Sequence, residues 1–330
     1  MNNIFTNSIF KFPILICLFF CFSSIYIFAF KKIIKKKVIP TGSGIILPSF
    51  LVISLENFYQ KNSFFYSILI IFFNSLLYFI DDIKNLKPYL RILISIFTGV
   101  SLLFVNSQNS ISLNFSSYIF LNYLFIVCLT CLLVNVLNFY DGSDLNLCSI
   151  ILFSGLILLV SNNYVLEYSK SLGAILISFS VGFGILNSKP KNIYLGDSGS
   201  FAVAALIIFI FISSLKESNY LPVEFIALLA LPIFDVLYVI LLRIINNHNL
   251  LTRNFLHLYQ RIQIRYKYFY YLVPNILNFF IFLVIFKILN NLSNNLYFSL
   301  FLCSFVFTPL VYLTIRKIYV EPKYFFGDGT

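Results

Sequence analysis

Five aspartates of this chain stand where long apolar runs begin or end. Asp81 and Asp82 follow one apolar run and directly precede another, Asp141 and Asp144 follow a third, and Asp197 opens a fourth. Carboxylate oxygens are hard ligands that suit Mg²⁺, which usually takes one or two of them together with phosphate oxygens of a substrate. The spacing therefore indicates a polar site at the ends of apolar segments, with metal or phosphate chemistry as its expected use.

The first pair of aspartates occupies an unfavourable position for a carboxylate. A helix C-terminus carries the negative end of the macrodipole and disfavours a negative charge by ~0.3–1 kcal/mol. Asp81 and Asp82 could nevertheless be solvated loop acids balanced by Lys84 and Lys87. A costly placement raises the expectation of a functional role, since perturbed charges gather at functional sites.

The second group of polar residues recurs every three residues. Asn135, Asn138, Asp141 and Asp144 end an apolar run. They would drift along one face of a continuing helix, whereas the glycine and serine between the two aspartates make a turn equally plausible. An Asn/Asp-rich cap is the structural alternative to a site.

The loop at residues 186–201 combines positive charge, glycines and a carboxylate. Lys189 and Lys191 precede Tyr194, whose ring could stack, and Asp197 lies between glycines. Glycines allow a ligand to approach the backbone, and a helix N-terminus attracts phosphate oxygens. Read alone, the motif is equally explained by an N-cap with turn glycines.

Both histidines of the chain lie at residues 248–262. His257 and Arg261 are four residues apart, so that both could contact one phosphate, and Arg253 would lie on the same side. An amphipathic helix on anionic lipid is the competing interpretation. Asp235 lies within an apolar run, where a carboxylate indicates either function or a polar contact between helices.

The elements that must position these residues are membrane helices. The chain has 330 residues, of which 60% are hydrophobic and 11% charged, and its mean hydropathy is +0.92. We therefore expect an all-α, polytopic integral membrane bundle that forms a single domain over residues 1–330, and we interpret the six cysteines as small apolar residues. A span needs about 20 mostly apolar residues. The predicted spans, about 11 in number, lie near residues 12–30, 38–55, 63–80, 89–105, 118–137, 147–160, 171–187, 200–215, 221–243, 270–289 and 297–315.

The basic residues orient this bundle. Loops that follow odd-numbered spans, together with the C-terminus, hold 18 of the 23 Lys and Arg residues, and every aspartate lies on or near the same face. The positive-inside rule puts that face in the cytoplasm. We predict a multi-pass protein of the cell (inner or plasma) membrane with a cytoplasmic active site, and no nucleic-acid partner, since no basic soluble module is present.

In order along the chain, these motifs resemble the polyprenyl-phosphate N-acetylhexosamine-1-phosphate transferases of glycosyltransferase family 4, which start lipid-linked O-antigen, teichoic acid and peptidoglycan synthesis. The resemblance spans residues 38–265. It rests on PTGSGI at 40–45, DDIKNLKPYLRI at 81–92, NVLNFYDGSD at 135–144, NSKPKNIYLGDSGS at 187–200, PIFD at 232–235 and HLYQRI at 257–262.

The resemblance implies a role for each site residue. Asp197 would ligate Mg²⁺, with Mn²⁺ as an alternative, and the paired aspartates would act on the lipid phosphate or position the metal. The implied catalytic residues are Asp81, Asp82, Asp141 and His257. The implied substrate-binding residues are Asn138, Asp144, Asn187, Tyr194 and Arg261.

Two positions depart from the pattern of that family. Leu145 stands where a second glycine usually follows the second aspartate, and Thr41 stands where an arginine usually precedes the glycine-rich turn. Both affect loops that would set the sugar preference. The single HLYQR motif resembles the O-antigen-initiating branch, and the phospho-MurNAc-pentapeptide transferase of peptidoglycan synthesis is the alternative within the family.

The expected reaction is attack of a polyprenyl phosphate on the β-phosphorus of a UDP-N-acetylhexosamine, which releases UMP. The expected partners are thus the UDP-sugar, the undecaprenyl-type lipid and the membrane, and a homodimer is left open. A secondary transporter would place its acids near the midplane between repeats. A structural subunit would not need five aspartates at one face.

Overall fold

The computed structural model describes the residues in helices and in the turns between most of them. These are residues 11–34, 39–54, 62–84, 86–106, 119–160, 168–189, 192–218, 222–248, 256–266, 270–293, 299 and 302–319. No strand occurs among them, in agreement with the all-α prediction. The chain separates into two compact units, Met1–Pro222 and Val223–Thr330, and the prediction of one single domain remains a prediction.

The first unit consists of eight α-helices and one 3₁₀ turn in its described part. In chain order they are α1 (Lys11–Ile34), the 3₁₀ turn Ser43–Ile45, α2 (Ile46–Ser54), α3 (Asn62–Lys84), α4 (Pro88–Asn106), α5 (Ile119–Tyr140), α6 (Asn146–Val160), α7 (Ser169–Asn187) and α8 (Gly196–Ser218).

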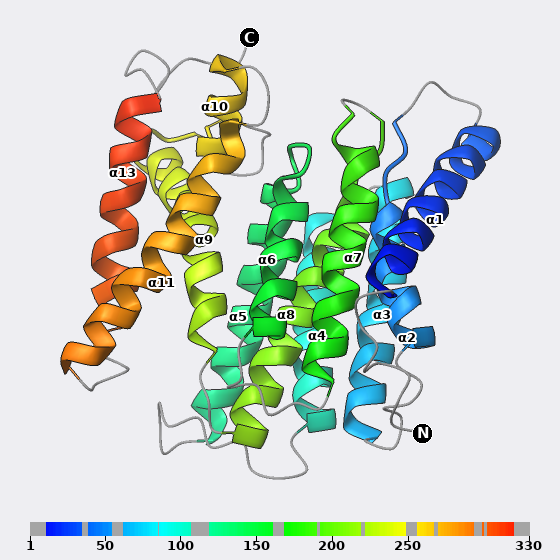
Figure 1. Cartoon of the computed structure of the whole chain (residues 1–330), viewed down its shortest axis with the longest axis horizontal. Helices are drawn as coiled ribbons and strands as arrows, with labels where there is room; N and C mark the ends of the chain where they lie inside the picture. The colour runs from blue at the N-terminus through cyan, green and yellow to red at the C-terminus, as the bar shows by residue number, and fades with distance from the viewer. Residues whose placement is uncertain are drawn as a thin grey trace. The chain divides into compact units, whose positions relative to one another are not determined.

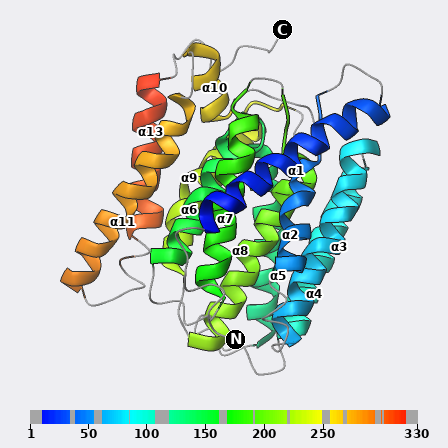
Figure 2. The same ribbon diagram turned by 45° about the vertical axis from the view of Figure 1, so that its right-hand side comes forward.

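Helix α8 forms the core of the first unit and is surrounded by other helices of that unit (Figures 1 and 2). Its segment Gly196–Leu215 is buried along its whole length, as expected for a helix that is apolar on every side. Tyr78 of α3 stacks on Phe201 with ring centroids 4.5 Å apart. Because α8 is held on all sides, its N-terminus has a fixed position.

Close helix packing in this unit depends on glycines. A Cβ at Gly182 of α7 would lie 2.5 Å from the Ile16 oxygen of α1, and a Cβ at Gly155 of α6 would lie 2.8 Å from the Gly173 oxygen of α7. Small residues that let helix backbones approach are typical of membrane helix pairs. Helix α1 crosses α7 obliquely at such a contact (Figure 2).

The second unit consists of α9 (Val223–Ile245), α10 (Leu258–Arg265), a 3₁₀ turn (Tyr270–Leu272), α11 (Val273–Ser293), a π-helical segment (Cys303–Phe307) and α13 (Thr308–Tyr319). Helix α9 packs against both α11 and α13, and the short α10 contacts α13.

Eight helices in the described part of the chain are long and apolar enough to cross a membrane. They are Phe12–Ile33, Ser63–Lys84, Pro88–Asn106, Phe120–Tyr140, Ser169–Asn187, Gly196–Leu215, Glu224–Ile245 and Tyr270–Leu289. Two shorter apolar helices are Ser43–Ser54 and Asn146–Val160. This composition supports a multi-pass membrane protein, but the described residues give eight candidate spans where about eleven were predicted.

The shortfall has a physical reason. A helix rises ~1.5 Å per residue and a bilayer core is ~30 Å thick, so Ser43–Ser54 and Asn146–Val160 are too short to cross it. Pro40 and the glycine turn at Gly42 prevent the helix at Ser43–Ser54 from starting earlier. The last predicted span, at 297–315, falls partly outside the described residues.

Two of the helix boundaries that differ from their predicted positions change where site residues lie. Helix α3 continues to Lys84, so that Asp81 and Asp82 lie in its last turn rather than after it. Helix α8 begins at Gly196 rather than near residue 200, so that Asp197 lies in its first turn.

Candidate active site

Four of the predicted aspartates meet at one end of the first unit. At this end α3, α5 and α7 finish and α4 and α8 begin. We define the aspartate cluster as Asp81, Asp82, Asp141 and Asp197 together with Arg91, because hydrogen bonds and ion pairs link their side chains or their backbones. The cluster joins three separate motifs of the sequence.

Two of these carboxylates cap helix α8. Asp82 accepts the N–H of Asp197 at 2.8 Å and the N–H of Ser198 at 3.1 Å. Asp141 accepts the N–H of Gly196 at 2.9 Å. The first N–H groups of a helix have no partner within it and carry the positive end of the macrodipole. The sequence predicted that this helix N-terminus could bind phosphate oxygens. In the structure it is occupied instead by carboxylates from α3 and from the turn after α5.

Asp81 is fully buried and is bound on two sides. Its Oδ1 accepts the N–H of Leu86 at 2.5 Å and a guanidinium hydrogen from Arg91 Nη2 at 3.0 Å, and its Oδ2 lies 2.6 Å from Arg91 Nε. These contacts close the turn between α3 and α4. The geometry gives Asp81 a positioning role, and its predicted action on the lipid phosphate stays a prediction.

Arg91 is the member of the cluster that the sequence did not identify as a site residue. It was counted among the basic residues that orient the chain. The structure places its Nη1 3.5 Å from Asp197 Oδ2, with the Arg91 side chain 33% and the Asp197 side chain 22% exposed. Arg91 thus bridges the buried Asp81 and the more exposed Asp197. Its presence in the DDIKNLKPYLRI motif was the available signal.

Asp141 and Asp144 lie on a turn and not on a helix face. Helix α5 ends at Tyr140 and residues 141–145 form the turn, which resolves the alternative left by the sequence. Burial raises the pKa of the Asp141 carboxyl well above its ordinary value. The Gly196 N–H opposes this shift in pKa, and the charges of Asp197, Asp82 and Asp144 add to it. Burial also raises the pKa of Asp144. Crowded carboxylates of this kind favour a bound cation.

Two more of the residues predicted to bind substrate lie near this turn. Asn187, at the end of α7, is buried; its Oδ1 accepts the N–H of Leu145 at 2.6 Å and its Nδ2 donates to the Ile193 oxygen at 2.8 Å. Asn187 therefore ties the turn that carries Asp144 to the loop before α8. Asn138 lies partly exposed in the last turn of α5. Their contacts with a nucleotide remain predictions.

The glycine-rich segment at 40–45 pairs with the loop before α8. Tyr194 donates its N–H to the Pro40 oxygen at 2.9 Å, and Gly44 donates to the Leu195 oxygen at 2.9 Å. Gly196 has a φ of +79°, and a Cβ there would lie 2.6 Å from Asp82 Oδ1. A side chain at position 196 would therefore displace the carboxylate that caps α8. Tyr194, one of the predicted substrate-binding residues, is held here through its backbone and is partly exposed.

His257 and Arg261, the remaining predicted site residues, belong to the second unit. His257 precedes α10 and is buried against Asp235, with 3.1 Å between Nδ1 and Oδ2. Arg261 lies partly buried on α10. Arg253, which the sequence grouped with them, falls outside the described residues, as does Lys191 of the loop before α8. The predicted contact of His257 with a phosphate stays a prediction.

The donor chemistry of the aspartate cluster fits a hard cation. Among the residues that the structure describes, no group of three or more His, Cys, Asp or Glu side chains is arranged to hold a metal ion. Mg²⁺ needs only one or two carboxylates when substrate phosphates and water complete its shell. Asp197 is the natural candidate, because its carboxylate is partly exposed.

Comparison with known proteins agrees with the motifs at the coarse level. A search of curated proteins found no match. Residues 64–215, which contain the whole aspartate cluster, match the model of a protein family described as glycosyl transferase family 4. That match shows that this part of the chain is similar to glycosyl transferase family 4, and it supports a transferase.

Proposed function

We propose that the protein transfers an N-acetylhexosamine 1-phosphate from a UDP-sugar to a polyprenyl phosphate, releases UMP, and thereby initiates a lipid-linked cell-surface polysaccharide of the O-antigen type. The aspartate cluster carries this proposal. It combines carboxylates and Arg91 at the end of membrane helices, within the residues that match the transferase family.

The reaction depends more on positioning the two phosphate groups than on proton transfer. An oxygen of the lipid phosphate forms a bond to the β-phosphorus, and the bond from that phosphorus to the oxygen shared with the α-phosphorus breaks. UMP leaves with that oxygen. A phosphate monoester with a second pKa of about 6 is largely dianionic at pH 7, so no side chain need act as a general base. Asp81 then serves to hold Arg91.

Asp197 is the residue that would hold Mg²⁺, or Mn²⁺ in its place. The bound ion would supply positive charge to the diphosphate and to the transferring phosphoryl group. Arg91 is placed to offset negative charge beside Asp197, since its Nη1 lies 3.5 Å from that carboxylate. Asp82 and Asp141 hold the first turn of α8, and therefore fix where Asp197 stands.

A groove between α3 and α4 supports a lipid acceptor. It has a volume of about 540 Å³ and a lining that includes Tyr66, Ile70, Phe73, Phe97 and Phe104. Exposed apolar side chains at positions 77 and 80 of α3 and 93 of α4 extend this surface toward the helix ends that carry Asp81 and Arg91. An isoprenoid chain in this groove would have its phosphate near the aspartate cluster.

The orientation belongs to the same proposal. The positive-inside bias favours a cytoplasmic location for the end of the first unit that bears the cluster, where it would meet UDP-sugars. Lys84 and Lys189 lie exposed at that end, and would attract an anionic nucleotide.

The released nucleotide tests the reaction. Purified protein is incubated with polyprenyl phosphate, Mg²⁺ and each of several UDP-N-acetylhexosamines. We expect UMP, and we expect added UMP to drive the exchange back, because one phosphoanhydride replaces another. Release of UDP would indicate an ordinary glycosyltransferase that breaks the sugar C1–O bond. That result, or the absence of UMP-driven exchange, would overturn the proposal.

A further inference from the structure

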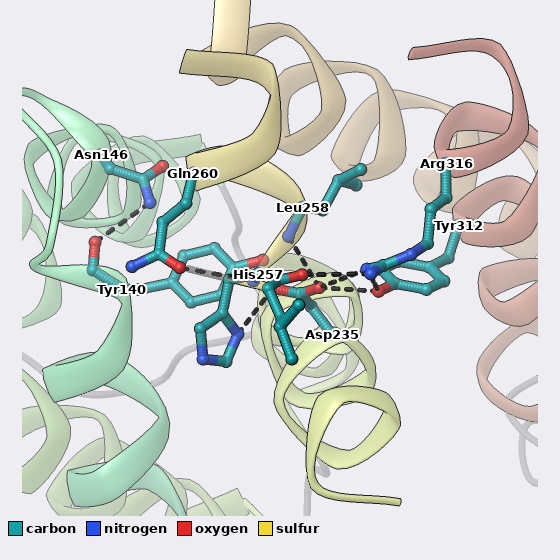
Figure 3. A network of polar contacts seen from close by, with 9 residues as sticks. Tyr140, Asn146, Asp235, His257, Leu258, Gln260, Tyr312 and Arg316 are labelled. Atoms are coloured by element: carbon teal, nitrogen blue, oxygen red, sulfur yellow. Dashed lines mark hydrogen bonds and ion pairs between the residues drawn. The ribbon is translucent and has the colours of Figure 1, made fainter. Parts of the chain in front are cut away.

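The second unit contains a buried polar network centred on Asp235 of α9 (Figure 3). Asp235 is fully buried, and its Oδ1 accepts the hydroxyl of Tyr312 at 2.7 Å and the N–H of Leu258 at 3.0 Å. Its Oδ2 lies 3.1 Å from His257 Nδ1. One carboxylate thus joins the middle of α9, the start of α10 and helix α13.

Arg316 of α13 is the cation of this network. Its Nη1 lies 3.8 Å from Asp235 Oδ1 and donates to the Tyr312 hydroxyl at 2.5 Å, while its Nη2 donates to the Leu256 oxygen at 3.1 Å. The guanidinium also lies 5.0 Å from the centre of the Tyr238 ring. Only 2% of Arg316 is exposed, so its charge is neutralised inside the protein by Asp235.

Helix packing alone does not account for such a network. Burial of two charges costs several kcal/mol per ion, and apolar residues of similar volume would often pack as well or better. The contacts instead converge on residues 256–258, the segment that leads into α10. Arg316 holds the oxygen of Leu256, and Asp235 holds the His257 ring and the N–H of Leu258.

We propose that Asp235 and Arg316 are positioning residues that fix the start of α10 and the orientation of the His257 ring. Both oxygens of Asp235 are acceptors, so the contact requires the proton on Nδ1 of His257 and thereby selects the tautomer. The helix that follows carries Arg261. The further expectation that His257 and Arg261 contact a diphosphate group rests on the proposed function.

The inference extends the working part of the protein beyond the family match. Tyr312 and Arg316 lie in α13, whereas the match ends at residue 215. The last described helix is therefore expected to be needed for function, because it supplies the cation that balances Asp235.

Hydrogen exchange tests the positioning without any assay of activity. In full-length protein in nanodiscs, Asp235→Asn and Arg316→Gln should speed amide exchange across residues 256–262 at least ten-fold, and exchange in the first unit should not change. Arg265→Gln, at the exposed end of α10, is the matched control and should leave exchange at the start of α10 unchanged. Unchanged exchange in both network variants would overturn the inference.

Kinetics test whether Asp235 acts through His257. Asp235→Asn should lower the rate of UMP release at least ten-fold in the natural background and less than two-fold when combined with His257→Gln. Additive effects would show that Asp235 does not act through His257, and would overturn that part of the inference.

Tyr312→Phe, which removes a single hydrogen bond and keeps the ring, provides a milder variant if Asp235→Asn does not fold. Like Asp235→Asn, it should speed amide exchange at residues 256–262 and lower the rate of UMP release, but by a smaller factor. Faster exchange in the variants of a protein that never releases UMP would contradict the proposed function and leave the positioning intact.

Discussion

At the N-terminus of α8, three backbone N–H groups are bonded to carboxylates, and this assigns different tasks to aspartates that look alike in the sequence. Asp82 and Asp141 hold the backbone of Gly196, Asp197 and Ser198, and Asp81 holds Arg91. Asp197 is the carboxylate whose position the other three determine. We therefore expect substitution of Asp197 to separate activity from stability.

Asp197→Asn should reduce UMP release by more than a hundred-fold and change the thermal midpoint little. The amide keeps the shape of the side chain but removes the negative charge that a hard cation requires. Asp328→Asn, at a position outside the described residues, serves as the matched control and should keep full activity. Equal activity of the two variants would contradict the assignment of Asp197 as metal ligand.

Leu145 has a strained backbone conformation, and substitutions at this position can measure the cost of that strain. Its φ of +61° lies in the left-handed region, which costs a residue with a Cβ ~1–2 kcal/mol and costs a β-branched residue more. Its N–H is held by Asn187, so the turn cannot relax freely. Leu145→Gly should therefore be at least ~1 kcal/mol more stable than Leu145→Val, although valine is the more apolar residue. Thermal unfolding in detergent measures the difference, and equal midpoints would show that the turn tolerates a branched side chain.

At the scale of the elements, the apolar runs predicted the helices well, because about 20 apolar residues leave few alternatives in a membrane. The ends of α3 and α8 were predicted less well. Asp81 and Asp82 continue α3 because their partners, Leu86, Arg91 and the start of α8, supply hydrogen bonds that local sequence does not reveal. Arg91 was missed as a site residue for the same reason.

The three-residue spacing of Asn138, Asp141 and Asp144 suggested a helix face as readily as a turn. The chain forms the turn, which brings Asp141 to Gly196. The aspartate motifs were thus predictable as a set from their types and order, whereas the division between positioning and exposed carboxylates depends on contacts between helices distant in sequence.

The contact between the glycine-rich segment and α8 gives a prediction at this scale. A Cβ at Gly44 would lie 2.1 Å from the Gly199 Cα, which is a backbone atom and cannot rotate away. Gly44→Ala should push the first turn of α8 from its carboxylates, lower stability by ~1–3 kcal/mol and abolish UMP release.

Gly184→Ala of α7 is the matched control for this substitution. Its Cβ would meet the flexible end of the Leu145 side chain at 3.3 Å, and alanine gains up to ~1 kcal/mol of helix propensity over glycine. The thermal midpoint and the rate of UMP release of the Gly184 variant should therefore stay close to those of the natural protein. Equal losses in the two variants would contradict the close contact at Gly44.

At the scale of the whole molecule, the face of the membrane on which the aspartate cluster lies determines which substrates can reach it. In the first unit, Lys84 lies in the last turn of α3 and Lys189 lies two residues after the end of α7. These are the helix ends at which the aspartate cluster forms. Lys170 lies exposed at the other end of α7, about 26 Å along the helix axis from Asn187 at ~1.5 Å per residue. The basic residues on the side of the cluster outnumber those on the other, so the positive-inside rule makes a definite prediction of sidedness.

Single cysteines at Lys84, Lys189 and Lys170 can test this orientation after the six natural cysteines are replaced. A membrane-impermeant maleimide added to intact cells should label the cysteine at position 170 and should reach positions 84 and 189 only after the membrane is opened. Labelling of all three from outside would place the aspartate cluster away from the UDP-sugar pool, and would contradict the cytoplasmic reaction even if Asp197 proved essential. Labelling of positions 84 and 189 alone would show that the bundle has the opposite orientation. The substrate would then have to be a nucleotide sugar available outside the cell. The positive charge at the end of the bundle that bears the aspartate cluster argues against this orientation.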